Sequence, residues 1–199
     1  MTFKVKDHYF NKAKKENYLA RSVYKLEEIN QKYQILFKKD HVLDLGYHPG
    51  SWTQYASQLV GAEGSVVGID IKEVNQKLSA LDNVTVFQKD INDVNTLEEL
   101  GVENKFDVVI SDMAPNTTGI KSVDQARSMQ LVEMVFYHLP NFLRPGGNFC
   151  IKIFDSHEAQ TFIKDQKKTF NSVNLLKPKS TRSVSKEFFL IGKGFKGNE

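Results

Sequence analysis

The stretch HVLDLGYHPGSWTQYASQLVG, residues 41–61, determines the fold that we expect for this chain. It reads as a short buried strand (41–46), a turn with two glycines, and a helix (52–61). Gly46 and Gly50 would let the backbone of the turn approach a ligand closely. Their G-x-x-x-G spacing differs from the G-x-G-x-x-G of dinucleotide-binding proteins, and the turn lacks the lysine of a phosphate-binding loop. The stretch therefore predicts an α/β domain whose ligand meets the backbone at this turn.

Strands and helices alternate outward from this stretch. The further strands that we expect are 65–71, 84–91, 106–113, 148–154, 173–178 and 187–195, and the further helices are 18–37, 97–102, 123–143 and 156–170. This alternation predicts a mostly parallel, seven-stranded sheet with helices on both faces. Only residues 179–186 join the last two strands, which is too short for a parallel crossover. We therefore expect the last strand to be antiparallel.

Size and composition fit one ordinary domain. The chain has 199 residues, 40% hydrophobic and 26% charged, and no apolar run near the roughly 20 residues that cross a bilayer. Cys150 is the single cysteine, so an intrachain disulfide and a cysteine metal cluster are excluded. The basic start of the chain lacks the apolar segment of a secretory signal, and a cytoplasmic location fits. We expect a mobile basic arm over residues 1–17 and a single domain over 18–199.

The mild net charge of +3 conceals a marked segregation of charge. Residues 1–39 carry ten Lys and Arg against four Asp and Glu, and residues 163–199 carry nine against three. The middle of the chain, residues 40–162, carries eight against seventeen. Basic ends around an acidic centre indicate that the ends bind a polyanion such as RNA.

Acidic residues stand at the ends of three of the expected strands, at Asp70, Asp90 and Asp112. Ligands of such sheets bind beyond the carboxyl ends of the strands. Asp70 would bind ribose hydroxyls and Asp90 would accept from an adenine amine, while the glycine turn offers little to a pyrophosphate. This combination favours S-adenosylmethionine over NAD or FAD as the cofactor. Trp52 either packs in the core or lines the cofactor pocket.

Four charged residues far apart in the sequence, Lys25, Asp112, Lys152 and Glu187, suit chemistry at a nucleotide hydroxyl. Each alone has an ordinary explanation, although a lysine inside the apolar strand FCIKIF would be costly to bury unpaired. We expect Lys152 to remove the proton of the hydroxyl and Asp112 to stabilise the resulting cation. A lysine serves as a base only when its pKa is depressed, as burial and nearby positive charge would do. Lys25 would hold the hydroxyl or a phosphate, and Glu187 would orient a lysine.

From about residue 18 to 194 the chain resembles the FtsJ/RrmJ family of ribose 2′-O-methyltransferases. The segments that carry the resemblance are ARSVYKLEEI, VLDLGYHPGSW, FDVVISDMAPNTTG, FLRPGGNFCIKIF and KPKSTRSVSKEFFLIG. The resemblance implies a Rossmann-like methyltransferase sheet and the same Lys-Asp-Lys-Glu set. It implies S-adenosylmethionine contacts at Gly50, Trp52, Asp70, Asp90 and Asp112.

The chain departs from the family pattern at the glycine turn. Where the family usually has DLGAAPGGW, this chain has Tyr47, His48 and Ser51. These bulkier side chains could narrow the methionine pocket and weaken cofactor binding. No second ligand lies at a metal-like spacing from His48, so no metal is expected.

The resemblance favours a uridine of the large-subunit ribosomal RNA as substrate, modified in the assembled particle. A monomer is the default expectation, since the sequence does not reveal the oligomeric state. A 2′-O-methyltransferase of a tRNA anticodon loop is the first alternative. The second is a non-catalytic RNA-binding ribosome-assembly factor, which the Tyr47-His48 pair supports best. A small-molecule methyltransferase is the third, but it would have no use for two basic ends.

Overall fold

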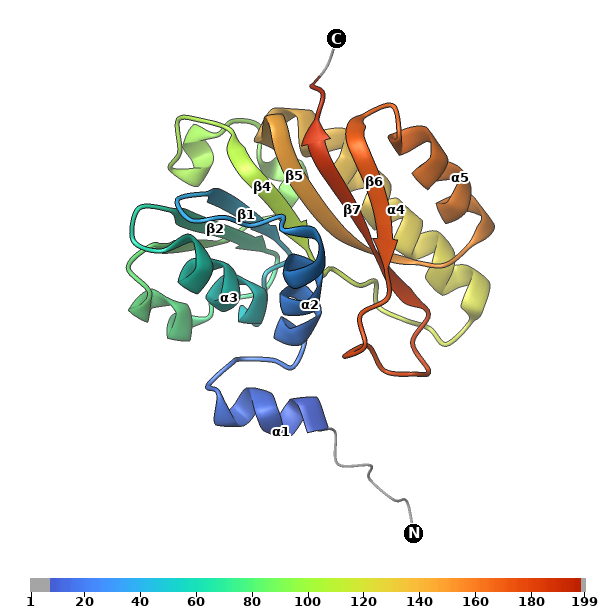
Figure 1. The fold of residues 1–199 in the computed structure, drawn as a ribbon, viewed down its shortest axis with the longest axis horizontal. Coiled ribbons are helices and arrows are strands. Elements are labelled where there is room, and N and C mark those ends of the chain that lie inside the picture. Colours follow the sequence, from blue (N-terminus) through green and yellow to red (C-terminus); the bar gives the residue numbers. More distant parts are fainter. Residues whose placement is uncertain (1–7, 198–199) are drawn as a thin grey trace.

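Seven strands form one sheet in the order β3-β2-β1-β4-β5-β7-β6 in the computed structural model, which describes residues 8–197 (Figure 1). The strands are β1 (His41–Leu45), β2 (Ser65–Asp70), β3 (Val84–Gln88), β4 (Phe106–Ser111), β5 (Leu143–Phe154), β6 (Phe170–Leu176) and β7 (Glu187–Phe195). The pairs β1–β2, β2–β3, β1–β4 and β4–β5 are parallel, and β7 is antiparallel to both β5 and β6. The predicted mostly parallel sheet with an antiparallel last strand is confirmed.

Helices cover both faces of the sheet, as predicted (Figure 1). The helices are α1 (His8–Lys15), α2 (Val23–Tyr33), α3 (Ser51–Val60), α4 (Lys121–Phe142) and α5 (His157–Gln166), with single turns η1 (Gln76–Ala80), η2 (Ile91–Asp93) and η3 (Glu98–Leu100). One core, with Leu26 and Ala56, lies between the sheet and the pair α2 and α3. The other, with Leu139 and Ile163, lies under α4 and α5. Across residues 8–197, none of the helices combines the length and the apolar character that a membrane span needs.

The two-residue period of the strands brings three of the predicted site residues to the face that α2 covers. The core residues on this face of the sheet include Ile110 of β4, Cys150 of β5 and Phe189 of β7. Successive side chains of a strand alternate between the two faces of a sheet, so residues two positions away share a face. Asp112 and Lys152 therefore extend this face at the carboxyl ends of β4 and β5. Glu187 extends it at the start of β7, which runs in the opposite direction.

Several boundaries differ from those expected. The helix expected over 18–37 is confined to α2, and Gln34 ends it in a left-handed conformation. The short helix expected over 97–102 is the single turn η3. The fifth strand begins at Leu143 rather than at 148. These shifts leave the carboxyl ends of the strands, where the site was expected, within a few residues of their predicted positions.

Helix α1 lies inside the stretch 1–17 for which the sequence predicted a mobile arm. Its Ala13 is buried, and the ring of Tyr9 packs against that of Tyr24 with 5.4 Å between centroids. The Tyr24 hydroxyl donates to a carboxylate oxygen of Glu16 at 2.7 Å. Residues 8–15 therefore form a helix docked on α2, which the prediction missed. Residues 1–7 lie outside the described part of the chain.

Tyr47, the largest departure from the family pattern, is buried with only 3% of its surface exposed. Its ring covers Gly68 of β2, where an added Cβ atom would lie 2.9 Å from the Tyr47 Cγ atom. Its hydroxyl accepts a hydrogen bond from the backbone N–H of Asn75 at 3.3 Å. Gly68 thus provides the space that the tyrosine ring occupies.

Gly68→Ala is expected to lower the free energy of unfolding by about 1–3 kcal/mol, because an added methyl group overpacks the Tyr47 ring. Urea denaturation of the wild type, Gly68→Ala, Tyr47→Ala and the double variant measures the coupling between the two positions. With Tyr47→Ala in place, the part of this cost that comes from the Tyr47 ring should disappear, and the part that comes from Val86 Cγ1, 3.0 Å from the added Cβ atom, should remain. An equal cost in both backgrounds would refute the compensation.

Candidate active site

The four charged residues predicted from distant parts of the sequence meet at the carboxyl ends of β4 and β5. Lys152 Nζ donates to Asp112 Oδ1 at 2.9 Å and to the Asp112 backbone oxygen at 2.6 Å. Lys25 Nζ, from α2, lies 2.5 Å from Glu187 Oε1 and 3.9 Å from Asp112 Oδ1. The side chains therefore form one chain of alternating charge in the order Glu187, Lys25, Asp112, Lys152.

These four side chains are largely withdrawn from solvent. The Lys152 side chain is 7% exposed, and those of Lys25, Glu187 and Asp112 are 12%, 13% and 18% exposed. Burying charges is costly unless each is paired, and two positive groups against two negative ones satisfy that condition. Burial favours the neutral form of Glu187, but the charge and hydrogen bond of Lys25 outweigh it, so the pKa of Glu187 lies below its ordinary value. Glu187 is therefore a carboxylate that holds Lys25 in place.

The glycine turn and the acidic end of β2 are joined at Asp70. Its carboxylate accepts from the backbone N–H of His48 at 3.1 Å and from that of Lys72 at 2.9 Å. Gly46 and Gly50 both have positive φ angles, 69° and 111°, which side chains with a Cβ atom rarely adopt. Asp70 therefore fixes the conformation of the turn and presents its remaining lone pairs at the strand ends.

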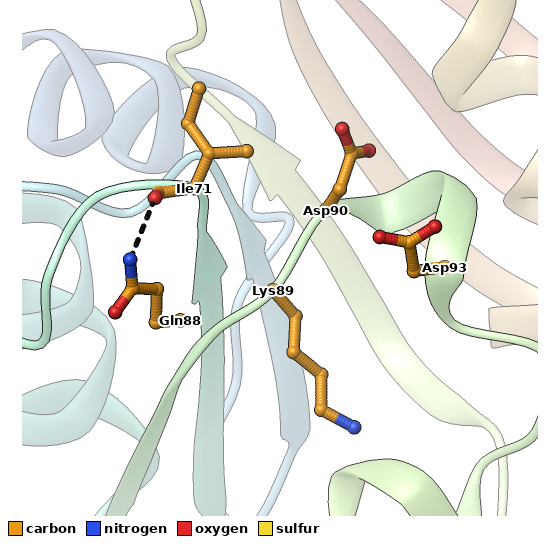
Figure 2. Close-up of a pocket in the computed structure, with 5 residues that line it drawn as sticks. All are labelled: Ile71, Gln88, Lys89, Asp90 and Asp93. Carbon is orange, nitrogen blue, oxygen red and sulfur yellow. Dashed lines mark hydrogen bonds between the residues drawn. The ribbon is translucent and has the colours of Figure 1, made fainter.

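An open pocket of about 420 Å³ lies beside the ends of β2 and β3 (Figure 2). It is lined by Ile71, Gln88, Lys89, Asp90 and Asp93. Ile71 is 70% exposed, and Figure 2 shows the Lys89 side chain directed away from the Asp90 carboxylate. An exposed apolar side chain next to a carboxylate suits a planar base with an amino group. The residues present thus fit the adenosyl end of S-adenosylmethionine.

The sequence pointed to Asp90 but not to Ile71 or Asp93. Ile71 directly follows Asp70, the last residue of β2. Because an apolar residue beside a buried strand looks like part of that strand, the sequence placed Ile71 inside the expected strand 65–71. Its exposure emerges only from the structure.

Trp52 belongs to the core rather than to the pocket wall. Its indole is 2% exposed, packs on Phe189 with 5.6 Å between ring centroids, and donates to the Ser22 backbone oxygen at 2.8 Å. Of the two roles considered from the sequence, the structure gives this side chain the packing role.

Two side chains that the sequence did not single out enclose the glycine turn. A Cβ atom on Gly50 would lie 2.6 Å from Leu78 Cδ1, and one on Gly46 would lie 2.0 Å from Met113 Cγ. Asn75 holds the η1 segment against the turn by donating to the Pro49 backbone oxygen at 2.7 Å. Both glycines are therefore required by close neighbours as well as by backbone conformation. In residues 8–197, no group of three His, Cys, Asp or Glu side chains is arranged to hold a metal ion.

A buried carboxyl, Asp44 of β1, lies under the site. It is 1% exposed and accepts from the Thr53 hydroxyl at 2.7 Å. Burial raises the pKa of Asp44 to about 7, and the negative charges of Asp112 and Asp70 add to this effect. The folded protein therefore retains a proton on Asp44 at pH values where the unfolded chain has lost it.

The stability of the wild type should therefore fall between about pH 4 and pH 7. The raised pKa of Asp44 stabilises the folded state at low pH, and this contribution is lost as the pH rises through the folded value. Its full size is up to about 4 kcal/mol, since each pKa unit corresponds to about 1.4 kcal/mol. Asp44→Asn stays neutral and should lack this fall. Urea denaturation of both proteins at several pH values checks it, and parallel pH profiles would contradict it.

The sheet order, the glycine turn followed by strand-end carboxylates, and the buried lysine and acid chain together define a methyltransferase of the Rossmann-like class. The chain belongs to the FtsJ-like methyltransferase family, whose model matches residues 18–195. A relative from Bdellovibrio bacteriovorus, named ribosomal RNA large subunit methyltransferase E, is 48% identical, and the alignment covers 96% of this chain and 98% of the relative. A relative of the same name from Syntrophobacter fumaroxidans is 47% identical, with 96% and 97% covered.

Solved structures agree with this assignment. A Plasmodium falciparum protein described as a ribosomal RNA methyltransferase superposes with a TM-score of 0.78 at 28% identity, covering 91% of this chain and 100% of that one. Aeropyrum pernix fibrillarin, solved with S-adenosyl-L-methionine, superposes with a TM-score of 0.63 at 15% identity, covering 86% and 76%, which supports the fold alone. Family membership confirms the predicted methyltransferase class and, with it, S-adenosylmethionine as cofactor.

Proposed function

We propose that this protein methylates the 2′-oxygen of a ribose, that of a uridine, in the large-subunit ribosomal RNA within the assembled particle in the cytoplasm. The observation that carries the proposal is the contact of Lys152 Nζ with two oxygens of Asp112, at 2.6 and 2.9 Å. It puts a buried amine at the strand ends where the methyl donor would bind. The names of relatives with 48% and 47% identity support ribosomal RNA as the substrate.

Lys152 is the base in this proposal. When bound, S-adenosylmethionine supplies a methyl group already activated on a positively charged sulfur. The glycine turn, Asp70 and Asp90 would hold it. The contacts of Lys152 Nζ with two Asp112 oxygens orient the nitrogen, which in this proposal takes the proton of the 2′-hydroxyl.

The other three residues support this proton transfer. Asp112 orients the amine before the reaction and stabilises the ammonium after it. Lys25, 3.9 Å from Asp112 Oδ1, holds the ribose hydroxyl or the adjacent phosphate. Glu187 fixes the position of Lys25 through their 2.5 Å contact.

Basic side chains on two segments would bind the RNA backbone around the target nucleotide. These side chains are Lys12, Lys14 and Lys15 of α1, and Lys177, Lys179, Arg182 and Lys186 between β6 and β7. Figure 1 shows α1 and the connection between β6 and β7 on the same side of the molecule, at the bottom of the view. Contacts of this kind bind phosphates with strong salt dependence and without reading the sequence of the RNA.

Transfer of tritiated methyl groups tests the substrate. Large ribosomal subunits and total tRNA from cells lacking this gene would be incubated with the protein and labelled S-adenosylmethionine. Label is expected in the subunits, with a rate that falls as salt rises. Label in tRNA would indicate the alternative of a tRNA anticodon-loop methyltransferase. Methyl transfer that continues after the RNA substrates have been digested with ribonuclease would indicate a small-molecule methyltransferase. Failure to label either RNA, with no binding of S-adenosylmethionine, would indicate a non-catalytic assembly factor.

A further inference from the structure

Side chains of α2, and of the turn just before it, contact the connection between β6 and β7, residues 177–186. Arg21, Lys25 and Glu28 recur at steps of four and three residues, the spacing that aligns side chains along one helix face. Arg21 Nη2 donates to the Ser180 backbone oxygen. Lys25 meets Glu187, the residue directly after the connection. The three residues therefore contact the connection near its start, at residues 179–180, and the residue directly after its end.

Glu28 makes the most directional of these contacts. One of its carboxylate oxygens accepts from the backbone N–H of Lys179 at 2.6 Å, and the other accepts from that of Ser180 at 2.8 Å. Hydrogen bonds from backbone N–H groups to a carboxylate are stronger than those between neutral groups. Ser180 is 1% exposed, so its end of the contact is shielded from water, whereas the contact with Lys179 lies at the surface. Glu28 therefore anchors the first half of the connection to α2.

The anchored connection leads into Glu187 through further hydrogen bonds. Lys177 Nζ donates to the Ser185 backbone oxygen at 2.7 Å, which ties the start of the connection to its end. The Ser185 hydroxyl oxygen accepts from the Glu187 backbone N–H at 3.3 Å. A shift of the connection away from α2 would therefore move the Glu187 carboxylate relative to Lys25.

We propose that Glu28 is a positioning residue for methyl transfer: it holds the connection against α2 so that Glu187 keeps Lys25 in place. The inference rests on the proposed function of the four charged residues. The cofactor side of the site is held by contacts that do not involve Glu28, because Asp70 accepts from the backbone N–H groups of His48 and Lys72. Loss of Glu28 should therefore slow the reaction without weakening the binding of S-adenosylmethionine.

Glu28→Ala and Glu28→Gln test this role, with Glu27→Ala as the matched control. Glu27 is the neighbouring glutamate on the same helix, and its charge acts on Tyr18, Tyr24 and Tyr55 instead. Glu28→Ala is expected to lower kcat by about 10–100-fold, since small displacements of positioning groups have effects of this size. Glu28→Gln keeps one acceptor oxygen and should lose less. The Kd for S-adenosylmethionine and the kcat of Glu27→Ala should change by less than about twofold.

A double-mutant cycle separates positioning from a general loss of stability. If Glu28 acts through Glu187, adding Glu28→Ala to Glu187→Ala should lower kcat by no more than about threefold further. Losses that multiply in the double variant, or a wild-type kcat in Glu28→Ala, would overturn the proposal.

Amide hydrogen exchange tests the anchor without any methyl transfer. The backbone amides of Lys179 and Ser180 should exchange faster in Glu28→Ala and in Glu28→Gln, and at the wild-type rate in Glu27→Ala. Unchanged protection in the Glu28 variants would contradict the anchor. Absence of methyl transfer by the wild-type protein would refute the proposed function instead, so the two failures are distinguishable.

Discussion

Replacing Lys152 with alanine is expected to abolish measurable methyl transfer, with kcat falling by about 10²–10⁴-fold, while S-adenosylmethionine still binds. The variant removes the amine that takes the proton of the hydroxyl. It leaves the glycine turn, Asp70 and the pocket beside Asp90 intact, and these bind the cofactor in our account. Single-turnover transfer to large ribosomal subunits measures the first effect, and calorimetric titration with S-adenosylmethionine measures the second.

Two further variants make the Lys152 result interpretable. Lys152→Met keeps the apolar part of the side chain in the strand and should be equally inactive, which separates loss of the amine from loss of packing. Lys164→Ala removes an exposed lysine of α5 and should retain full activity. Transfer by Lys152→Ala at a rate close to that of the wild type would exclude Lys152 as the base.

Asp112→Asn should affect rate, cofactor binding and stability together. The substitution leaves Lys25 and Lys152 with Glu187 as the remaining carboxylate of the chain of four. Removing one partner of a buried ion pair costs about 3–5 kcal/mol, and the partial exposure of Asp112 puts the expected loss near the lower end. The rate should fall, but by less than in Lys152→Ala, because the amine loses its orienting carboxylate and keeps its contact with the Asp112 backbone oxygen. A weaker affinity for S-adenosylmethionine is expected as well.

Thermal unfolding, cofactor titration and single-turnover transfer check the three effects of Asp112→Asn. Asp82→Asn is the matched control, since Asp82 precedes β3 at the opposite edge of the sheet. A variant at Asp112 with wild-type stability and rate would show that the two lysines do not depend on this carboxylate.

Local sequence was sufficient to predict most of the fold. Short apolar runs between segments of helical periodicity predicted the seven strands. The small number of residues between the last two strands, 179–186, predicted that the last strand is antiparallel. The sequence also predicted four site residues, because two lysines and two carboxylates in suitable contexts occur together in it. The structure brings these residues, Lys25, Asp112, Lys152 and Glu187, into contact. The side of the sheet on which they meet follows from strand alternation, because Asp112 and Lys152 stand two positions after core residues of that face.

Features that depend on contacts between distant segments could not be predicted. The burial of Trp52 depends on Phe189 and Ser22, which lie far from it in the sequence. The exposure of Ile71 depends on where β2 ends, and strand ends are the least certain part of a periodicity argument. The anchoring role of Glu28 depends on backbone N–H groups about 150 residues away, which no side-chain pattern encodes. Helix α1 is short and polar, and its docking depends on aromatic contacts with α2.

The position of the transferred methyl group tests the central claim most directly. Ribosomal RNA labelled by the protein would be recovered from large subunits and hydrolysed in alkali, which cleaves beside a free 2′-hydroxyl and not beside a 2′-O-methyl group. Label in alkali-resistant dinucleotides is the result that our account predicts. Label in mononucleotides would place the methyl group on a base and contradict it.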